Sequence, residues 1–309
     1  MDLSSFLSLN HEEIAKIMRA DGPKVCACPI NGTRRWYILE YASREVEKES
    51  SYLNIVLRKY IEIFRLFFTY GIDTVLTPIF GPDLLNRGDD YLEVAIQGMK
   101  DLVTDDKFRD FLMTDQVRVR FYGDYVRRFR GTRFEFLIEL FEGLTAETLH
   151  HSRYRLFWGV FGNDATEQVA EIGARFFIQE NRYPSRKEII ESYYGEYVDP
   201  VSLFIGYDKL SAFDMPILAT GEEDLYFTTS PTPYLTERQV RMILFDHLYS
   251  RKGEPNYADF EVEDWKRMRL FYETNRENTM GVGINIQGIW YPLSQVDGIE
   301  KLLIDQKRN

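Results

Sequence analysis

Short apolar runs alternate with stretches of helical periodicity along most of the chain. The apolar runs predict six buried strands, at 24–30, 72–80, 116–122, 156–161, 201–206 and 225–229. Apolar residues spaced three and four apart predict helices at 52–70, 90–102, 165–179, 185–194 and 236–249. This alternation indicates an α/β fold with a mostly parallel central sheet flanked by helices.

The sequence shows no sign of a division into several domains. We find no repeat, low-complexity tract or Pro/Gly-rich linker in its 309 residues. The chain is therefore expected to form a single domain over residues 1–309. Within it, residues 253–309 are polar and rich in aromatic side chains, and they form a C-terminal extension of uncertain role.

Charge and composition narrow the range of functions. The chain has 49 acidic and 38 basic residues, a net charge of -11. Non-specific nucleic-acid binding needs a surplus of Lys and Arg, so no nucleic-acid partner is expected. Aromatic residues make up 15% of the chain. They indicate either a large aromatic core or a pocket shaped for a hydrocarbon and its cations, because aromatic faces stabilise positive charge by about 0.5–2 kcal/mol each.

The chain carries no signal for export or for a membrane. Residues 1–20 lack the basic region and apolar core of a secretory signal. The longest apolar runs fall short of the roughly 18 residues that a membrane span needs. Cys26 and Cys28 leave the same face of the first predicted strand, and we expect them to be buried and unpaired in a reducing compartment. The sequence thus predicts a cytoplasmic protein without a membrane span.

Open parallel sheets bind their ligands beyond the carboxyl ends of the strands. We therefore expect the site among the segments that follow the first four predicted strands, after Ile30, Phe80, Tyr122 and Phe161. The first of these segments carries the most informative chemistry.

That first segment, the loop 31–36, is suited to a diphosphate. Arg34 and Arg35 place two guanidinium groups beside Gly32, whose missing side chain lets backbone N–H groups approach a ligand. Arginine is the preferred bidentate partner of a diphosphate. Because the chain as a whole is acidic, two adjacent arginines are more informative here than they would be in a basic protein. A surface turn with two solvated arginines is the alternative.

Several segments resemble, in order, the landmarks of the cis-prenyltransferases, such as undecaprenyl diphosphate synthase. Gly32, Arg35 and Trp36 match the signature D-G-N-G-R-W of that family. Four further segments match landmarks of that family in the same order. Residues 72–80 resemble its strand T-L-Y-A-F, and residues 117–124 resemble its motif V-R-V-R-F-I-G-D. Residues 158–163 resemble its N-Y-G-G-R region, and residues 225–229 resemble its strand E-L-Y-F. The resemblance implies a cis-prenyltransferase-like fold.

One departure from that family argues against chain elongation. Elongating members bind isopentenyl diphosphate with an R-T-S-G-E-x-R-x-S stretch before the L-Y-F strand. The corresponding residues here, 205–211, contain no arginine. Without a guanidinium clamp the second diphosphate would lose much of its binding, so condensation is not expected.

A narrower resemblance covers roughly residues 20–250. The segments N-G-T-R-R-W, G-V-F-G-N-D-A and R-K-E-I-I-E-S-Y-Y-G-E-Y-V-D are similar to those of the tuberculosinol/isotuberculosinol synthase (tuberculosinyladenosine transferase) and kolavelool synthase group. This resemblance implies an enzyme that takes a bicyclic C20 diphosphate from a separate class II diterpene cyclase. Such an enzyme ionises the allylic C–O bond and lets water, or adenosine in the transferase, capture the cation. A homodimer is implied as well.

The resemblance also assigns roles to residues of the first loop. Arg34 and Arg35 match the arginines that bind the diphosphate, and Gly32 and Thr33 supply further contacts of that loop. Neutralising both arginines would therefore abolish the predicted function.

Two tyrosines, Tyr52 and Tyr91, match residues placed near the allylic cation. A phenol with a pKa of about 10 stays neutral at pH 7, so it can orient water or face the cation with its ring. The alternatives are a helix tyrosine at the solvent edge for Tyr52, and the N-terminal turn of a helix for Tyr91.

Four further residues are secondary candidates: Trp36, Asp89, Asp124 and Asn163. Asp89 and its neighbour Asp90 form a weak metal motif. Asn163 with Asp164 can instead cap the helix predicted from residue 165.

Asn31 stands where the family has its metal-binding Asp. An amide oxygen carries no charge, so it should bind Mg²⁺ less well than a carboxylate. Three explanations are open: a natural variant that ionises substrate with little help from the metal, an inactive relative, or a change from Asp introduced to trap substrate. The intact remainder of the loop favours the third.

These inferences predict a diterpene synthase that uses Asn31, Tyr52 and Tyr91 in catalysis, with Mg²⁺ as the expected cofactor, and releases an alcohol. Transfer to adenosine, an elongating cis-prenyltransferase and a non-catalytic partner subunit are the alternatives.

Overall fold

A parallel six-stranded sheet forms the centre of the protein. The computed structural model describes residues 1–41, 52–82, 88–253 and 256–293. The strands lie in the order β3-β4-β2-β1-β5-β6, and every neighbouring pair is parallel. Their bounds are Val25–Ala27 (β1), Thr74–Phe80 (β2), Val117–Tyr122 (β3), Tyr154–Val160 (β4), Leu203–Tyr207 (β5) and Asp224–Thr228 (β6). The predicted α/β class and all six predicted strands are confirmed.

The first strand is shorter than the predicted 24–30. One further ladder bond runs from the Cys28 N–H to the Leu76 carbonyl (2.8 Å). The next residue is Pro29, which has no N–H to donate, so regular pairing ends there. Cys26 and Cys28 are buried free thiols, as expected, and burial raises the pKa of Cys28 to about 12.

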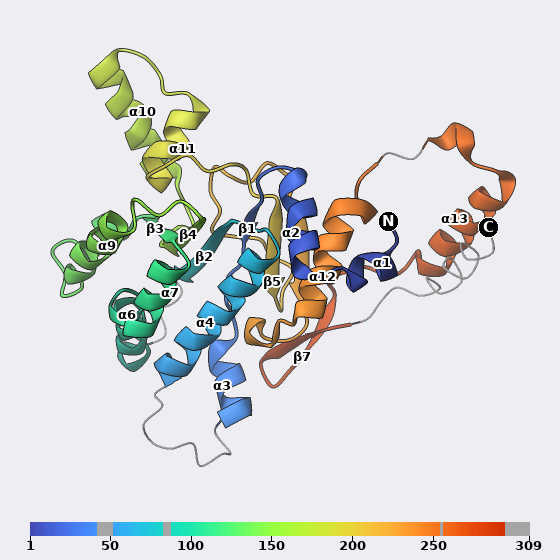
Figure 1. Ribbon diagram of the computed structural model, residues 1–309, viewed down its shortest axis with the longest axis horizontal. Coiled ribbons are helices and arrows are strands. Elements are labelled where there is room, and N and C mark those ends of the chain that lie inside the picture. The colour runs from blue at the N-terminus through green and yellow to red at the C-terminus, as the bar shows by residue number, and fades with distance from the viewer. Residues whose placement is uncertain (42–51, 83–87, 254–255, 294–309) are drawn as a thin grey trace.

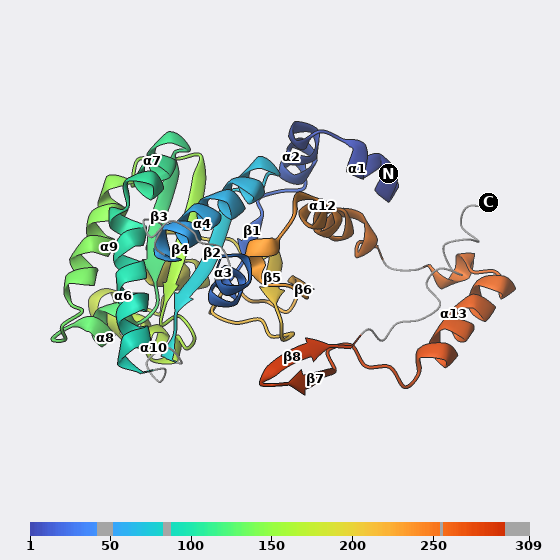
Figure 2. The same cartoon turned by 90° about the horizontal axis from the view of Figure 1, so that it is seen from below.

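Helices cover both faces of the sheet (Figures 1 and 2). One face carries α4 (Tyr52–Thr69), α6 (Asp89–Thr104), α7 (Asp106–Thr114) and α9 (Phe136–Glu147), and the other carries α10 (Thr166–Glu180) and α11 (Arg186–Tyr194). Strand β4 shows why both faces are apolar. Its Leu156 and Trp158 point into one hydrophobic cluster, and Phe157 points into the other.

Aromatic side chains supply much of this core. Phe121 stacks on Phe141 with ring centroids 4.0 Å apart, and Phe68 stacks on Tyr154 at 4.1 Å. Trp158, between Tyr60 and Phe64, is fully buried. The large aromatic core therefore accounts for a substantial part of the aromatic content.

Several helices were not predicted. They are α1 (Leu3–Ser8), α2 (His11–Ala20), α3 (Thr33–Tyr41), α7, α8 (Tyr125–Phe129), α9 and α13 (Val262–Asn275). The predicted helix 236–249 is confirmed in its first part as α12 (Glu237–Phe245), which continues as a π-helix over Asp246–Ser250.

The C-terminal part contains α13 and a hairpin of β7 (Gly283–Ile286) and β8 (Ile289–Pro292), which pair antiparallel. Helix α13 lies away from the central sheet, and the hairpin returns toward β6 (Figure 2). A Cβ on Gly281, just before the hairpin, would lie 3.0 Å from Leu210, so this segment contacts the β5–β6 connection. Across the described ranges, no helix is long and apolar enough to cross a membrane.

Candidate active site

The expected loop 31–36 is in fact the start of a helix. Only Asn31 and Gly32 precede α3, which begins at Thr33. The first helical hydrogen bond runs from the Trp36 N–H to the Gly32 carbonyl (2.9 Å). The N–H groups before Trp36 therefore have no acceptor within the helix. This correction strengthens the anion hypothesis, because a helix N-terminus presents N–H groups and a positive dipole end to an anion.

Gly32 is required by the packing around it. Its φ of +77° lies in the left-handed region, which disfavours residues with a Cβ. A Cβ at this position would also lie 2.8 Å from the Cβ of Pro231 and 2.9 Å from Cε1 of Tyr207. The glycine thus lets the backbone turn into α3 against two residues from distant parts of the chain.

Hydrogen bonds tie the residues before and along α3 to the segment 232–234. The Asn31 N–H donates to Thr232 Oγ1 (3.2 Å), and the Thr232 N–H donates to the Asn31 carbonyl (3.1 Å). Further along the helix, Tyr234 Oη donates to Glu40 (2.6 Å). Asn31 itself is exposed at the carboxyl end of β1. Its backbone is therefore held in place while the side chain remains accessible to a ligand.

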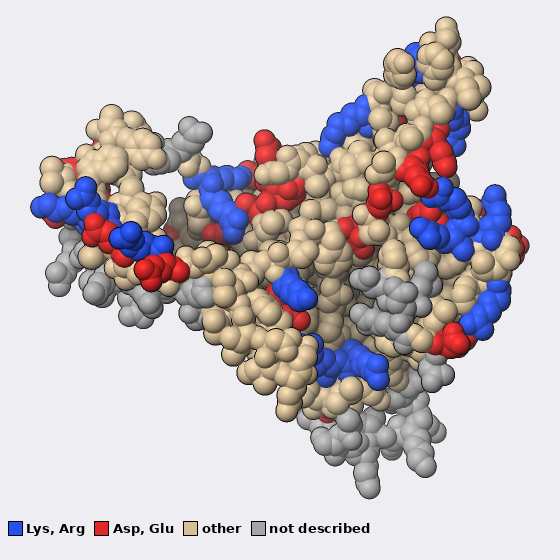
Figure 3. Space-filling model, turned by 180° about the vertical axis from the view of Figure 1, so that it is seen from behind, with Lys and Arg blue, Asp and Glu red and all other residues tan. Residues whose placement is uncertain are grey.

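The two arginines sit in different environments. Arg34 is exposed, and Arg35 is half-buried with Nη1 donating to Tyr207 Oη and its guanidinium 5.8 Å from the centre of the Tyr207 ring. Among the described residues, neither guanidinium has a carboxylate within ion-pair distance. Figure 3 shows a basic patch in the region of α3 with mainly uncharged surface around it. Two adjacent uncompensated positive charges at a helix N-terminus form a suitable site for a polyanion.

The structure brings Tyr52 to this helix N-terminus. Its Oη lies 2.9 Å from Thr33 Oγ1, and its ring packs edge-on against Tyr37 with centroids 5.1 Å apart. Burial raises the pKa of Tyr52, with a further contribution from Tyr91, whereas Thr33 and Arg34 act in the opposite direction. Tyr52, Tyr91 and the loop residues are thus neighbours, and their catalytic roles stay predictions.

The raised pKa of Tyr52 predicts the pH dependence of activity. Because the shift favours the neutral phenol, Tyr52 should stay protonated from about pH 7 to about pH 9. We expect kcat/KM to show no loss from phenolate formation in that range when product release is measured across it. A fall in that range that disappears in the Tyr52→Phe variant would contradict this prediction.

The secondary candidates lie apart from one another. Trp36 is buried in α3, where it packs against Tyr41, and Asp89 is exposed at the start of α6. Asn163 is exposed after β4. The structure shows no direct contact of these three with Asn31 in the described part of the chain. The side chain of Asp90 lies outside the described residues.

Asp124 is committed to a different interaction. Both of its carboxylate oxygens accept N–H groups of Arg127, at 2.8 to 3.0 Å, and Arg128 adds a contact at 3.3 Å. The residue is 8% exposed. Its carboxylate therefore compensates local arginines and is not available to a metal without breaking those bonds.

A magnesium ion would find few protein ligands here. No group of three or more His, Cys, Asp or Glu side chains suited to a metal is present in the described ranges. The N-terminus of α3 offers the amide of Asn31 and the hydroxyl of Thr33. Since Mg²⁺ is commonly held by one or two protein groups together with substrate phosphates, these residues fit only an ion that arrives with the diphosphate.

Sequence reasoning missed Tyr207 and Thr232. Tyr207 ends β5, next to the strand that leads into Gly32, and lies within the stretch 205–211 that drew attention only for its missing arginine. Burial raises the pKa of Tyr207 although Arg35 lowers it, so the phenol stays neutral and does not cancel the guanidinium charge. Thr232 carries no pattern in the sequence that points to the loop.

Replacing Tyr207 with Phe is expected to lower kcat about tenfold to a hundredfold. The change removes the acceptor that holds Arg35 and keeps the ring, and a hydrogen bond to a charged group contributes about 1.5–3 kcal/mol. Steady-state kinetics and the inhibition constant of inorganic diphosphate measure the effect, with the exposed Tyr272→Phe as control. If Tyr207 acts through Arg35, the loss vanishes in an Arg35→Ala background. An equal loss in both backgrounds would refute that role.

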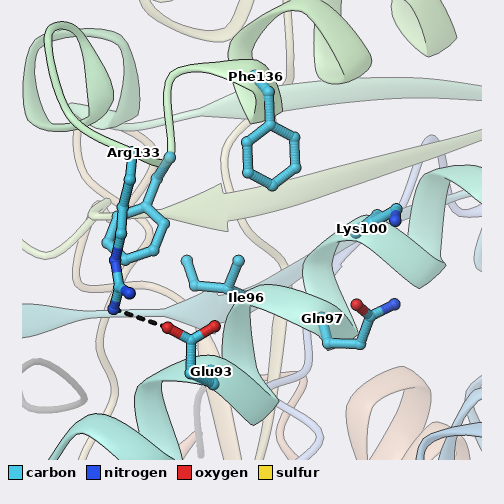
Figure 4. A pocket seen from close by; sticks show the side chains of 7 residues that line it. Glu93, Ile96, Gln97, Lys100, Arg133 and Phe136 are labelled. Atoms are coloured by element: carbon cyan, nitrogen blue, oxygen red, sulfur yellow. Dashed lines mark ion pairs between the residues drawn. The ribbon is translucent and has the colours of Figure 1, made fainter.

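A cavity of about 200 Å³ lies beside α6 (Figure 4). Glu93, on α6, forms an ion pair of 2.7 Å with Arg133 at its wall. Ligand pockets usually span about 300–1,000 Å³, so this space is small for a C20 group. None of the predicted site residues lines this cavity.

Two relatives match nearly the whole chain. It is 40% identical over 289 residues to the tuberculosinyl adenosine transferase of Mycobacterium tuberculosis (strain CDC 1551 / Oshkosh), covering 93% of this chain and 96% of the relative. It is 23% identical over 282 residues to the (+)-kolavelool synthase of Herpetosiphon aurantiacus, covering 90% and 92%. No protein-family model matches the sequence.

Solved structures show the same arrangement of the sheet and helices. A probable undecaprenyl diphosphate synthase from Campylobacter jejuni superposes with a TM-score of 0.55 at 13% identity, covering 77% of this chain and 99% of that one. The lavandulyl diphosphate synthase from Lavandula x intermedia, in complex with dimethylallyl diphosphate, gives 0.56 at 12% identity, covering 77% and 98%. At these identities the likeness concerns the fold alone.

Proposed function

The chain belongs to the family of tuberculosinyl adenosine transferase and has the cis-prenyltransferase fold, and from that premise we propose that it ionises a bicyclic C20 allylic diphosphate. One observation carries the proposal. Arg34 and Arg35, without a carboxylate partner in the described residues, stand in the first turn of α3 beside the neutral phenol of Tyr52. This arrangement suits a leaving diphosphate and a cation formed next to it.

The mechanism follows from where charge develops. As the allylic C–O bond breaks, negative charge grows on the diphosphate, and donors fixed beforehand stabilise it most. Arg35 is held by Tyr207, and the N–H groups at the start of α3 are fixed by the helix. Mg²⁺, when bound, would add positive charge to the departing diphosphate, with the Asn31 amide as its protein ligand.

Neutral aromatic groups would stabilise the cation. Tyr52 and Tyr91 offer ring faces and hydroxyls without a negative charge that would trap the cation as an ion pair. Tyr60 lies near both tyrosines, and burial raises its pKa. We propose that water attacks the cation to give a diterpene alcohol of the halimane or clerodane type.

Transfer of the same group to adenosine is the second candidate. The relative with 40% identity is named for that reaction, whereas the synthase relative shares 23% identity. Both reactions share the ionisation step and differ only in the nucleophile. An elongating reaction is disfavoured because residues 205–211, which the resemblance matches to the arginine-containing stretch of elongating members, contain no arginine.

Incubation with defined substrates tests the proposal. The purified chain is mixed with Mg²⁺ and either linear geranylgeranyl diphosphate or two bicyclic products of class II cyclases, with and without adenosine, and the products are identified by mass spectrometry. Release of diphosphate with an alcohol, or with an adenosine adduct, supports the respective candidate. Incorporation of labelled isopentenyl diphosphate would instead establish elongation.

A lack of diphosphate release from every C20 substrate would favour a non-catalytic partner subunit. The proposal also implies a class II cyclase in the same pathway, a homodimer and a cytoplasmic location. Size-exclusion chromatography with light scattering measures the oligomeric state directly.

A further inference from the structure

Residues 278–293, which include the β7–β8 hairpin, form an uncharged segment. They contain no Asp, Glu, Lys or Arg, although 28% of the whole chain is charged. The hairpin turns through two residues, Gln287 and Gly288, whose φ angles are both positive, at 53° and 83°. A turn of this kind matches the twist of the two strands, so it fixes which residues share a face of the hairpin.

One face of the hairpin is apolar and open. Ile284 pairs with Tyr291, and residues directly opposite in an antiparallel pair point to the same side. The pairing extends to Leu293, whose N–H donates to the Val282 carbonyl (3.0 Å). The face consists of six apolar residues: Val282, Ile284, Ile286, Ile289, Tyr291 and Leu293. All of them except Ile289 are 44–51% exposed, and exposed apolar surface gathered in this way marks an interaction site.

The end of β5 connects this hairpin with the start of α3. At Gly281 the segment contacts Leu210, three residues beyond Tyr207, and Figures 1 and 2 show the hairpin on the side of the sheet where β5 and β6 lie. Burial is the main cause of the raised pKa of Tyr207, and Tyr291 adds to it, so the two phenols lie within electrostatic range of each other. Tyr207 also accepts the hydrogen bond of Arg35. The same tyrosine is thus a neighbour of the proposed diphosphate site and of the apolar face.

A basic site next to an open apolar face is complementary to an amphiphile with an anionic end. We propose that the hairpin covers the allylic end of the bound C20 diphosphate, and that Tyr291 is a further substrate-contacting residue. The ring of Tyr291 and the neighbouring Ile284 contact the hydrocarbon next to the diphosphate and exclude bulk water from the cation. This inference rests on the proposed function and deepens it.

A lipid surface matches the hairpin less well. Membrane-binding segments attract anionic headgroups with Lys and Arg, and residues 278–293 contain neither. The ring of Trp290 packs on Gly283, where a Cβ would lie 2.3 Å from Cε2 of the indole. The aromatic side chain best suited to a membrane interface therefore lies against the hairpin itself.

Amide hydrogen exchange of the full chain tests this inference. The ligands are inorganic diphosphate and a bicyclic C20 thiolodiphosphate, in which sulfur replaces the bridging oxygen so that ionisation is very slow. We expect the C20 analogue, but not inorganic diphosphate, to slow the exchange of residues 283–292 at least about fivefold. Slower exchange at the start of α3 alone would overturn this inference and leave the proposed function standing, whereas no change in either segment would refute both. Slowing that follows protein concentration instead of the analogue would assign the face to a second copy and overturn the inference.

Matched variants provide an independent measurement. Tyr291→Ala and Ile284→Ser are each expected to raise KM for the C20 diphosphate about tenfold, and to leave the inhibition constant of inorganic diphosphate unchanged. Tyr272→Ala and Leu270→Ser make the same changes at exposed positions of α13 and should alter neither constant. An allylic cation can be captured at either end, so loss of the cover should also change the ratio of the two alcohols. Thermal unfolding confirms that the variants fold. An unaltered KM and product ratio in both hairpin variants would contradict the inference.

Discussion

Replacing both Arg34 and Arg35 with Ala is expected to lower kcat/KM for diphosphate release by at least about a thousandfold, since each charge-assisted hydrogen bond contributes about 1.5–3 kcal/mol. Both side chains leave the first turn of α3, and in the described part of the chain no carboxylate competes with a ligand for them. Their positive charge is therefore available for the leaving group. Removing it leaves the N–H groups of the helix, and Mg²⁺ when it is bound, to stabilise the developing charge.

Steady-state measurement of released diphosphate, together with binding of inorganic diphosphate, checks this result. The double change of Arg269 and Arg276 to Ala is the matched control, because both are exposed and remote from α3 on or just after α13. We expect Arg35→Ala to be more harmful than Arg34→Ala, because Tyr207 already orients Arg35 and little freedom is lost when it binds. Unchanged product formation in the double variant would refute the proposal that Arg34 and Arg35 bind the diphosphate.

The architecture was predictable because parallel strands are buried on both faces. Segments such as 72–80 and 156–161 read as continuous apolar runs, and the structure places them as neighbouring strands of the sheet. The predicted helix 185–194 was also found, since Ser185 and Glu188 form the capping box visible in the sequence. The residues within each of these segments determine its structure, so the segment can be predicted from its own sequence.

A comparable signal at the N-terminus was overlooked. Helix α2 begins after Asn10, whose side chain and that of Glu13 form a capping box as well. The start of α3 differs, because the residue before it is Gly32, which has no side chain to cap the helix and so gives no signal in the sequence. Its position depends on contacts with residues near 207 and 231, far away in the sequence.

The site was predictable only in its chemically distinctive part. The paired arginines stand out in an acidic chain, and the segment after the first strand is where parallel sheets bind ligands. Tyr207 and Thr232 acquire a role only when β5 and the residues after β6 fold beside that segment. Neither residue type is unusual at a strand end, so tertiary structure had to reveal them.

Replacing Asn31 with Asp is expected to raise turnover at least about tenfold in the presence of Mg²⁺, because a carboxylate binds this cation much better than an amide does. The backbone of residue 31 is held by two hydrogen bonds to Thr232, so the new carboxylate should occupy the place of the amide. Position 31 is exposed, so the new carboxylate would ionise with little desolvation cost. The nearby guanidinium groups of Arg34 and Arg35 would favour its charged form.

Two measurements separate a metal effect from other causes. Turnover is followed against Mg²⁺ concentration, and binding of Mn²⁺ to the diphosphate-bound protein is measured by electron paramagnetic resonance. Asn181→Asp, an exposed change at the C-terminal end of α10, is the matched control and should leave both unchanged. Tighter metal binding together with faster turnover in Asn31→Asp would mean that the amide limits the chain as it stands. An unchanged rate at saturating Mg²⁺ would show that position 31 takes no part in the reaction, and would leave ionisation to the arginines and the start of α3 alone.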